Sequence, residues 1–260
     1  MVDFSAEHLD LRRRAMARYT GWQGVDALNP KAPAGHACGV RVSVRLSRQF
    51  KHARRGLAMD ISPQDVIDIL VAAGVRKWVL MGLHGYVGYL PDPRAAQDVD
   101  VMVSRRERKR AIEAVRRAWP DLILQEFSQV ARFLDPQDRN SHGQPKPVIG
   151  LMLPVAEFQK TILKEYVITD AETGHRIPRL EAALVSKYAA MISPHRDADK
   201  KEYDCGDFRT MVRANSAAIQ REDLRRLAGQ VWEGGSEEIE RFLEIALSNQ
   251  PFPFVNTHGE

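Results

Sequence analysis

Hydrophobic and polar positions change from a strand-like to a helix-like pattern near the middle of the chain. The runs 77–82 (KWVLMG) and 98–103 (DVDVMV) are short, apolar and bounded by turn residues, which is typical of buried strands. Residues 62–74 begin with a Ser-Pro pair, carry an apolar face and end in glycine, so they predict a helix. Residues 41–50 (RVSVRLSRQF) alternate between polar and apolar types, which favours a further short strand.

The remaining elements complete a mixed pattern. Before Pro154 we expect a turn or short helix at 84–90 and a basic amphipathic helix at 105–119. A hairpin of 122–129 with 130–136, a polar loop at 138–147 and a strand at 148–153 follow. Beyond Pro154 the helical segments are 156–168, 181–192, 197–212, 221–232 and 236–249. The fold class predicted is α/β (α+β): a small mixed sheet flanked by helices, followed by a helical C-terminal half.

These patterns divide the chain into three predicted parts: a basic, partly disordered segment (1–58), an α/β domain (59–155) and a helical domain (156–260). The net charge of +4 is uneven, because residues 1–60 hold eleven Lys/Arg against five Asp/Glu and the rest sums to −2. Such a leader suits contact with RNA phosphates, and it equally suits a solvated tail. The sequence leaves both alternatives open.

Several classes of protein are disfavoured by composition. No run approaches the roughly 18 uninterrupted apolar residues of a membrane helix, and the charged start lacks the features of a secretory signal. Cys38 and Cys205 lie far apart and show no zinc-ligand spacing, so we expect free thiols. The sequence therefore predicts a cytoplasmic protein with no membrane partner.

Asp98 and Asp100 are the strongest candidates for chemistry. Two positions apart in a strand, their side chains point to the same face, while Val99 and Val101 point to the other. Adjacent carboxylates repel each other, and a hard divalent ion such as Mg²⁺ relieves that repulsion. The alternative is a structural pair at a strand edge that faces water.

A glycine-terminated strand at Gly82, an arginine at Arg94 and this Asp-x-Asp resemble the signature of the DNA polymerase beta nucleotidyltransferase superfamily. Residues 79–103 look most like the abortive-infection type E nucleotidyltransferase toxins. The resemblance implies that Asp98 and Asp100 ligate Mg²⁺, that the backbone at Gly82 approaches the triphosphate, and that Arg94 braces the turn or the phosphates.

The resemblance extends to the helical half. It implies that Lys187 on the helix 181–192, together with Asp204 or Asp207, faces the nucleotide. From the residues alone, Lys187 also fits a lysine that snorkels from a half-buried face, and either aspartate fits a surface ion pair. The implied activity is Mg²⁺-dependent transfer of a nucleotide from an NTP to a hydroxyl of RNA (such as tRNA), a protein or a small molecule, as a toxin with a cognate antitoxin.

Three positions depart from the family pattern: Leu83 replaces the second small residue, Ala96 replaces a Thr or Ser, and Gly150 replaces the third carboxylate on a later strand. Asp135 or Asp138, expected in the preceding loop, are candidate substitutes if the hairpin folds over the site. Gly150 favours a second hypothesis, a degenerate relative that binds nucleotide or RNA without chemistry. Under a third hypothesis the resemblance is accidental and the strand is structural.

Overall fold

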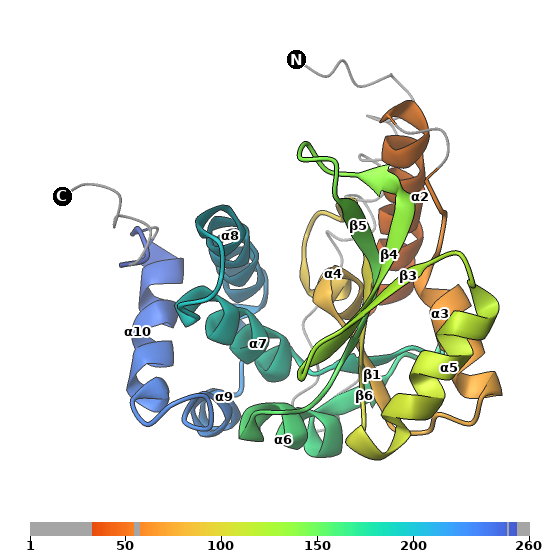
Figure 1. Cartoon of the computed structure of the whole chain (residues 1–260). Helices are drawn as coiled ribbons and strands as arrows, with labels where there is room; N and C mark the ends of the chain where they lie inside the picture. Colours follow the sequence, from red (N-terminus) through yellow and green to blue (C-terminus); the bar gives the residue numbers. More distant parts are fainter. Residues whose placement is uncertain (1–32, 55–57, 249, 254–260) are drawn as a thin grey trace.

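The computed structural model describes residues 33–54, 58–248 and 250–253, and in this part a mixed sheet forms the centre (Figure 1). Its strand order is β1-β2-β5-β4-β3. The pair β2 and β5 is parallel and the other pairs are antiparallel. The strands are β1 (Trp78–Met81), β2 (Val99–Val103), β3 (Ile123–Glu126), β4 (Val130–Arg139) and β5 (Pro145–Met152). The mixed α/β fold class is thus confirmed, as is the hairpin of β3 with β4.

The two faces of the sheet are covered by different helices. Val99, Val101 and Val103 join an apolar cluster with residues of α3 (Pro63–Ala72) and α5 (Arg108–Ala118). Met102 points to the opposite face and joins the cluster of the helical half. Because side chains alternate along a strand, Asp100 faces the helical half too, and Asp98 stands directly before the first residue of β2.

That helical half begins after a short connection. Helix α6 (Glu157–Glu165) leads to a two-stranded ribbon of β6 (Val167–Thr169) and β7 (Arg176–Pro178). The helices that follow lie together on one side of the sheet (Figure 1). They are α7 (Leu180–Ile192), α8 (Ala198–Asn215), the short η3 (Ser216–Ala218), α9 (Arg221–Ala228) and α10 (Gly235–Ser248). None of the helices described here is long and apolar enough to cross a bilayer.

The strand predicted at 41–50 is wrong, because these residues belong to a helix, α2 (His36–Arg54). Its buried positions include Ala37, Val40 and Ser43, a spacing of three that fits a helix. Valines at alternate positions also fit a strand, and packing decided between them. Helix α2 lies against the short elements α4 (Gly82–Tyr86) and η1 (Val87–Tyr89), which confirm the turn or short helix expected there.

Other corrections are smaller. The polar loop expected at 138–147 is shorter, since β4 continues to Arg139 and β5 begins at Pro145. The helix expected to reach residue 168 ends at Glu165, and its last residues enter β6. Cys38 and Cys205 are free thiols, as expected. Residues 1–32, where most of the predicted basic leader falls, lie outside the described residues, and the three-part division of the chain stays a prediction.

A buried histidine pair ties α2 to the core. The ring Nε2 of His36 lies 3.1 Å from Nδ1 of His175, whose Nε2 lies 3.0 Å from Oε1 of Gln64 on α3. Burial and the neighbouring His175 lower the pKa of His36 to about 4, and burial also lowers the pKa of His175. Both rings are thus neutral in the folded protein at neutral pH.

We expect the free energy of unfolding to fall as the pH falls from about 6.5 to about 4. In this window the unfolded chain binds a proton at His36 and the folded chain does not, so the folded state loses on the order of 3 kcal/mol. Urea denaturation at pH 7, 6, 5 and 4 measures this change. His36→Gln should flatten the pH profile, whereas a matched change of the exposed His52 on the same helix should not; an unchanged profile in His36→Gln contradicts the prediction.

Candidate functional site

The carboxylate of Asp100 lies over two glycines. Asp100 on β2 pairs with Met81 of β1 and with Gly150 of β5. A Cβ atom at Gly150 would lie 2.2 Å from Oδ1 of Asp100, and one at Gly82 would lie 2.9 Å from Oδ2. Gly82 also has a φ of +57°, which favours glycine. At Gly150 the space that Asp100 occupies favours glycine, and at Gly82 both that space and the backbone conformation favour it.

Asp98 and Asp100 are both half-buried and close enough to affect each other. Burial, and then the charge of Asp98, raises the pKa of Asp100 to about 8. Burial also raises the pKa of Asp98. Arg132 opposes both shifts, and Lys187 opposes the shift of Asp100. The nearby cations do not fully compensate these two carboxylates. Two neighbouring carboxylates of this kind suit a hard divalent cation, which binds oxygen ligands and supplies the missing positive charge.

The helical half contributes an ion cluster centred on Lys187. Its Nζ donates hydrogen bonds of 2.8 Å to Oδ1 of Asp204 and 2.8 Å to Oδ2 of Asp207. Arg94 also donates to Oδ2 of Asp207, at 2.7 Å, and so does the hydroxyl of Tyr86, at 2.7 Å. Sequence reasoning named Arg94, Lys187 and both aspartates, and the structure brings all four together; it missed Tyr86.

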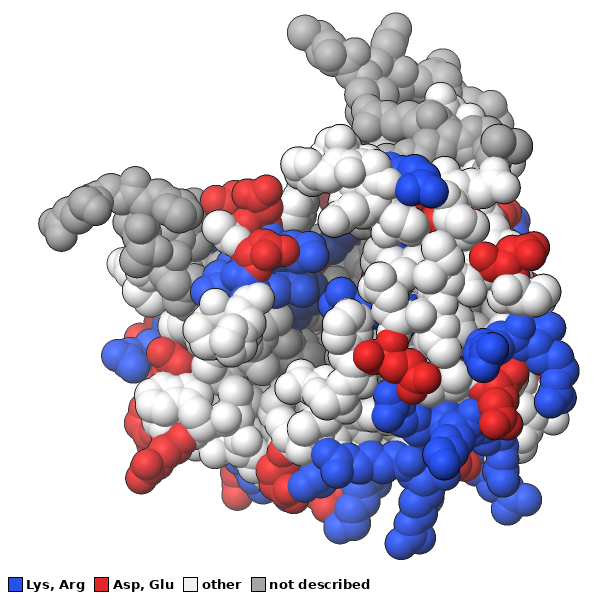
Figure 2. All heavy atoms as spheres, in the orientation of Figure 1, with Lys and Arg blue, Asp and Glu red and all other residues white. Residues whose placement is uncertain are grey.

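Electrostatics links this cluster to the paired aspartates. Burial raises the pKa of Asp207, but Lys187 and Arg94 outweigh that effect and hold the pKa below its usual value. The pKa of Lys187 is raised, because Tyr86 and the two aspartates outweigh its burial. Figure 2 shows Lys and Arg side chains gathered where the helical half meets the sheet. Lys187 and Arg196 both lower the pKa of Asp100 from that side.

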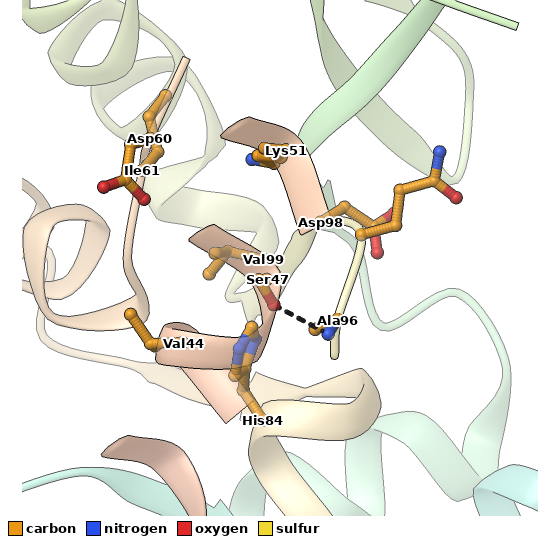
Figure 3. Close-up of a pocket in the computed structure, with 10 residues that line it drawn as sticks. Val44, Ser47, Lys51, Asp60, Ile61, His84, Ala96, Asp98 and Val99 are labelled. Carbon is orange, nitrogen blue, oxygen red and sulfur yellow. Dashed lines mark hydrogen bonds between the residues drawn. The ribbon is translucent and has the colours of Figure 1, made fainter. Parts of the chain in front are cut away.

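Helix α2 completes the surroundings of Asp98, a contribution that the sequence does not predict because the pattern of residues 41–50 favours a strand. Ser47 Oγ accepts a hydrogen bond of 2.9 Å from the amide of Ala96 (Figure 3). The signature that this segment resembles has a hydroxyl at position 96, and here a hydroxyl reaches the same segment from α2. A small hollow between α2 and this segment is lined by Lys51, His84 and Asp98, among others (Figure 3).

The candidate substitutes for a third carboxylate have other roles. Asp135 is fully buried, and its carboxylate accepts hydrogen bonds from the amides of Met59 (2.7 Å) and Gln137 (2.8 Å). Asp138 lies 3.8 Å from Nζ of Lys146. Among the residues that the structure describes, no group of three or more His, Cys, Asp or Glu side chains is arranged to hold a metal. The substitution of a third ligand by Asp135 or Asp138 is therefore not supported.

Comparisons with known proteins add little. No protein-family model matches the chain, and none of the curated proteins matches it. A solved structure with some similarity is an antigenic nucleotidyltransferase-like protein from Paracoccidioides brasiliensis, 14% identical, with a TM-score of 0.42, covering 75% of this chain and 94% of that chain. A likeness this weak carries no functional argument. The class defined by this structure is a mixed α/β protein with paired aspartates on the sheet face next to a helical half.

Proposed function

We propose that this protein is a nucleotidyltransferase-type nucleotide-binding protein that uses Mg²⁺ and a nucleoside triphosphate. The observation that supports it best is the position of Asp100, which follows Asp98 by two residues. Its carboxylate lies against Gly82 on one side and Gly150 on the other. Burying a carboxylate costs free energy unless the charge is compensated. Stability alone therefore does not explain two half-buried carboxylates here, with a glycine on either side of Asp100. Asp98 and Asp100 are the residues that would hold the metal.

The proposed chemistry is transfer of a nucleotide to a hydroxyl. The acceptor oxygen forms a bond to the α-phosphorus, the bond from that phosphorus to the bridging oxygen breaks, pyrophosphate leaves and the hydroxyl proton passes to solvent. Bound Mg²⁺ supplies charge neutralisation on the phosphates. Lys187 and Arg94, held by Asp207, add fixed positive charge beside the site, and such preorganised charge favours the transition state.

The acceptor and the biological role rest on the sequence resemblance. We infer an acceptor hydroxyl on RNA such as tRNA, on a protein or on a small molecule, in a cytoplasmic toxin with a cognate antitoxin. The acceptor can be identified by incubating the protein with radiolabelled NTP and each class of acceptor.

A second function has its own supporting observation. On strand β5, the residue that pairs with Asp100 is Gly150, at the position where the resemblance leads us to expect a third carboxylate. A protein with two acidic ligands instead of three suits nucleotide binding without transfer. Measured nucleotide binding together with no transfer to any acceptor would favour this degenerate form.

We expect Mg²⁺ and the preferred NTP together to raise the melting temperature, because a ligand that binds only the folded state stabilises it by about 2.7 kcal/mol at 100 times its Kd. The measurement is a thermal melt with each of the four ribonucleoside triphosphates, with and without Mg²⁺.

The double variant Asp98→Ala/Asp100→Ala should lose the metal-dependent shift. The control is Asp92→Ala, which changes an aspartate of the preceding loop. If no NTP shifts the wild-type melt in the presence of Mg²⁺, the proposal is wrong and a structural role for the paired aspartates is favoured.

A further inference from the structure

An arginine stands next to the position of the missing carboxylate. Across the sheet, Asp100 of β2 pairs with Gly150 of β5, and Gly150 pairs with Arg132 of β4. Directly paired residues of neighbouring strands project to the same face. Ala131 and Phe133, on either side of Arg132, are buried in the cluster on the other face, which independently places Arg132 on the face of Asp100.

Gly150 carries no side chain, so it does not separate the two charged residues. Two strand spacings, about 10 Å, separate the backbones of β2 and β4. The carboxylate of Asp100 already leans over Gly150, towards β4. A long arginine side chain from β4 can therefore reach a ligand that sits on Asp100.

The guanidinium of Arg132 is held without using its donors. Its Cζ lies 5.6 Å from the centroid of the Phe127 ring, and the ring is half exposed at the turn between β3 and β4. Within the described part of the chain, Arg132 has no hydrogen bond or ion pair. Stacking on an aromatic face orients a guanidinium and leaves its N–H edge available to an anion.

The other cations near the paired aspartates are already engaged. Lys187 and Arg94 donate to Asp207, and Arg196 donates to Asp204 at 2.9 Å. Arg132 differs from them because its five donors remain available, and it is the first positive charge among those that lower the pKa values of Asp98 and Asp100. An anion could bind a metal held by the two aspartates and, at the same time, accept hydrogen bonds from the N–H groups of Arg132.

We propose that Arg132 binds the phosphate chain of the nucleoside triphosphate, beside the metal-binding aspartates and next to the position where the family has its third carboxylate. This inference rests on the proposed function of the site. A guanidinium contacts phosphate oxygens in a bidentate manner, and the triphosphate offers more of these oxygens and more charge than a monophosphate. Arg132 therefore selects the triphosphate form of the ligand.

The test compares the affinities of Arg132→Gln and Arg132→Lys with that of the wild type. Isothermal titration with Mg²⁺ gives Kd for the NTP that stabilises the wild type best and for the matching monophosphate. We expect Arg132→Gln to weaken triphosphate binding about 10- to 100-fold and monophosphate binding less than about twofold. Arg132→Lys keeps the charge and should recover part of the loss.

Two controls make the outcomes distinguishable. Arg116→Gln changes an exposed arginine of α5, on the other face of the sheet, and should leave both affinities unchanged. Ligand-free melting temperatures, expected to match in all variants, show whether Arg132 is needed for folding.

Each other outcome overturns the inference. If Arg132→Gln binds triphosphate as the wild type does, while Asp98→Ala/Asp100→Ala binds none, the inference on Arg132 is wrong and the proposed function stands. An equal loss for triphosphate and monophosphate also contradicts it, because the arginine would then not act on the added phosphates. If the wild type binds neither nucleotide, the proposed function itself falls and the inference falls with it.

Discussion

Replacing Gly150 by aspartate is expected to weaken metal-dependent nucleotide binding, although this change adds the carboxylate that the sequence resemblance leads one to expect there. A Cβ atom at position 150 would lie 2.2 Å from Oδ1 of Asp100, so the carboxylate of Asp100 has to turn away. On the other side of this carboxylate, a Cβ atom at position 82 would lie 2.9 Å from Oδ2. The new carboxylate would also stand beside Arg132 and pair with it.

The expected size of the effect is at least about tenfold in Kd for Mg²⁺ with NTP, the range seen when a group that orients a metal ligand is disturbed. Gly150→Ala adds the Cβ without the charge and should show most of the loss. Gly206→Ala is the matched control, because a Cβ at Gly206 of α8 meets no atom within 4 Å. A gain of nucleotide transfer in Gly150→Asp would show that only the third carboxylate was missing.

Lys187→Met is expected to destabilise the folded protein by about 3 kcal/mol. Methionine is unbranched like lysine and keeps the apolar contacts of its stem, but it leaves Asp204 and Asp207 without their shared partner. Both aspartates are buried, and an uncompensated buried charge costs about 3–5 kcal/mol. The remaining bonds from Arg94 and Arg196 place the expectation at the lower end of that range.

Urea denaturation measures this loss. Lys164→Met is the matched control, since Lys164 is 80% exposed and pairs only with Glu165 at the surface, where a salt bridge contributes about 0–1 kcal/mol. Lys187→Met/Asp207→Asn removes one of the two orphaned charges and should regain part of the stability. If the free energy of unfolding of Lys187→Met equals that of the wild type, the ion cluster does not hold α7 to α8.

The parts of the site that are local in sequence were predictable. Gly82, Asp98 and Asp100 lie within one strand-turn-strand segment, and period-two alternation alone places both aspartates on one face. The resemblance named Lys187 and Asp207, which lie on different helices, and the structure shows a direct bond between them. Their roles in binding nucleotide stay predictions until the titrations are made.

The parts that depend on long-range pairing were not predictable. Arg132 lies in line with Gly150 and Asp100 only because of the register in which β4 pairs with β5. That register contains shifts near Leu134 and Asp135, which no hydrophobic pattern reveals. Likewise Ser47 reaches Ala96 only because α2 is a helix. In residues 41–50 the valines fit both the two-residue period of a strand and the 3.6-residue period of a helix, so tertiary packing decided the conformation.

The hydrogen bond between Ser47 and Ala96 limits where the chain can be cut to make a shorter protein for experiments. The amide of Ala96 stands two residues before Asp98, and the hydroxyl that holds it comes from a helix that ends before residue 58. A fragment cut at the sequence boundary near Ala58 keeps every strand of the sheet and both aspartates. It nevertheless loses the anchor that fixes the approach to the first of them, so a weak or inactive fragment would say nothing about the full chain.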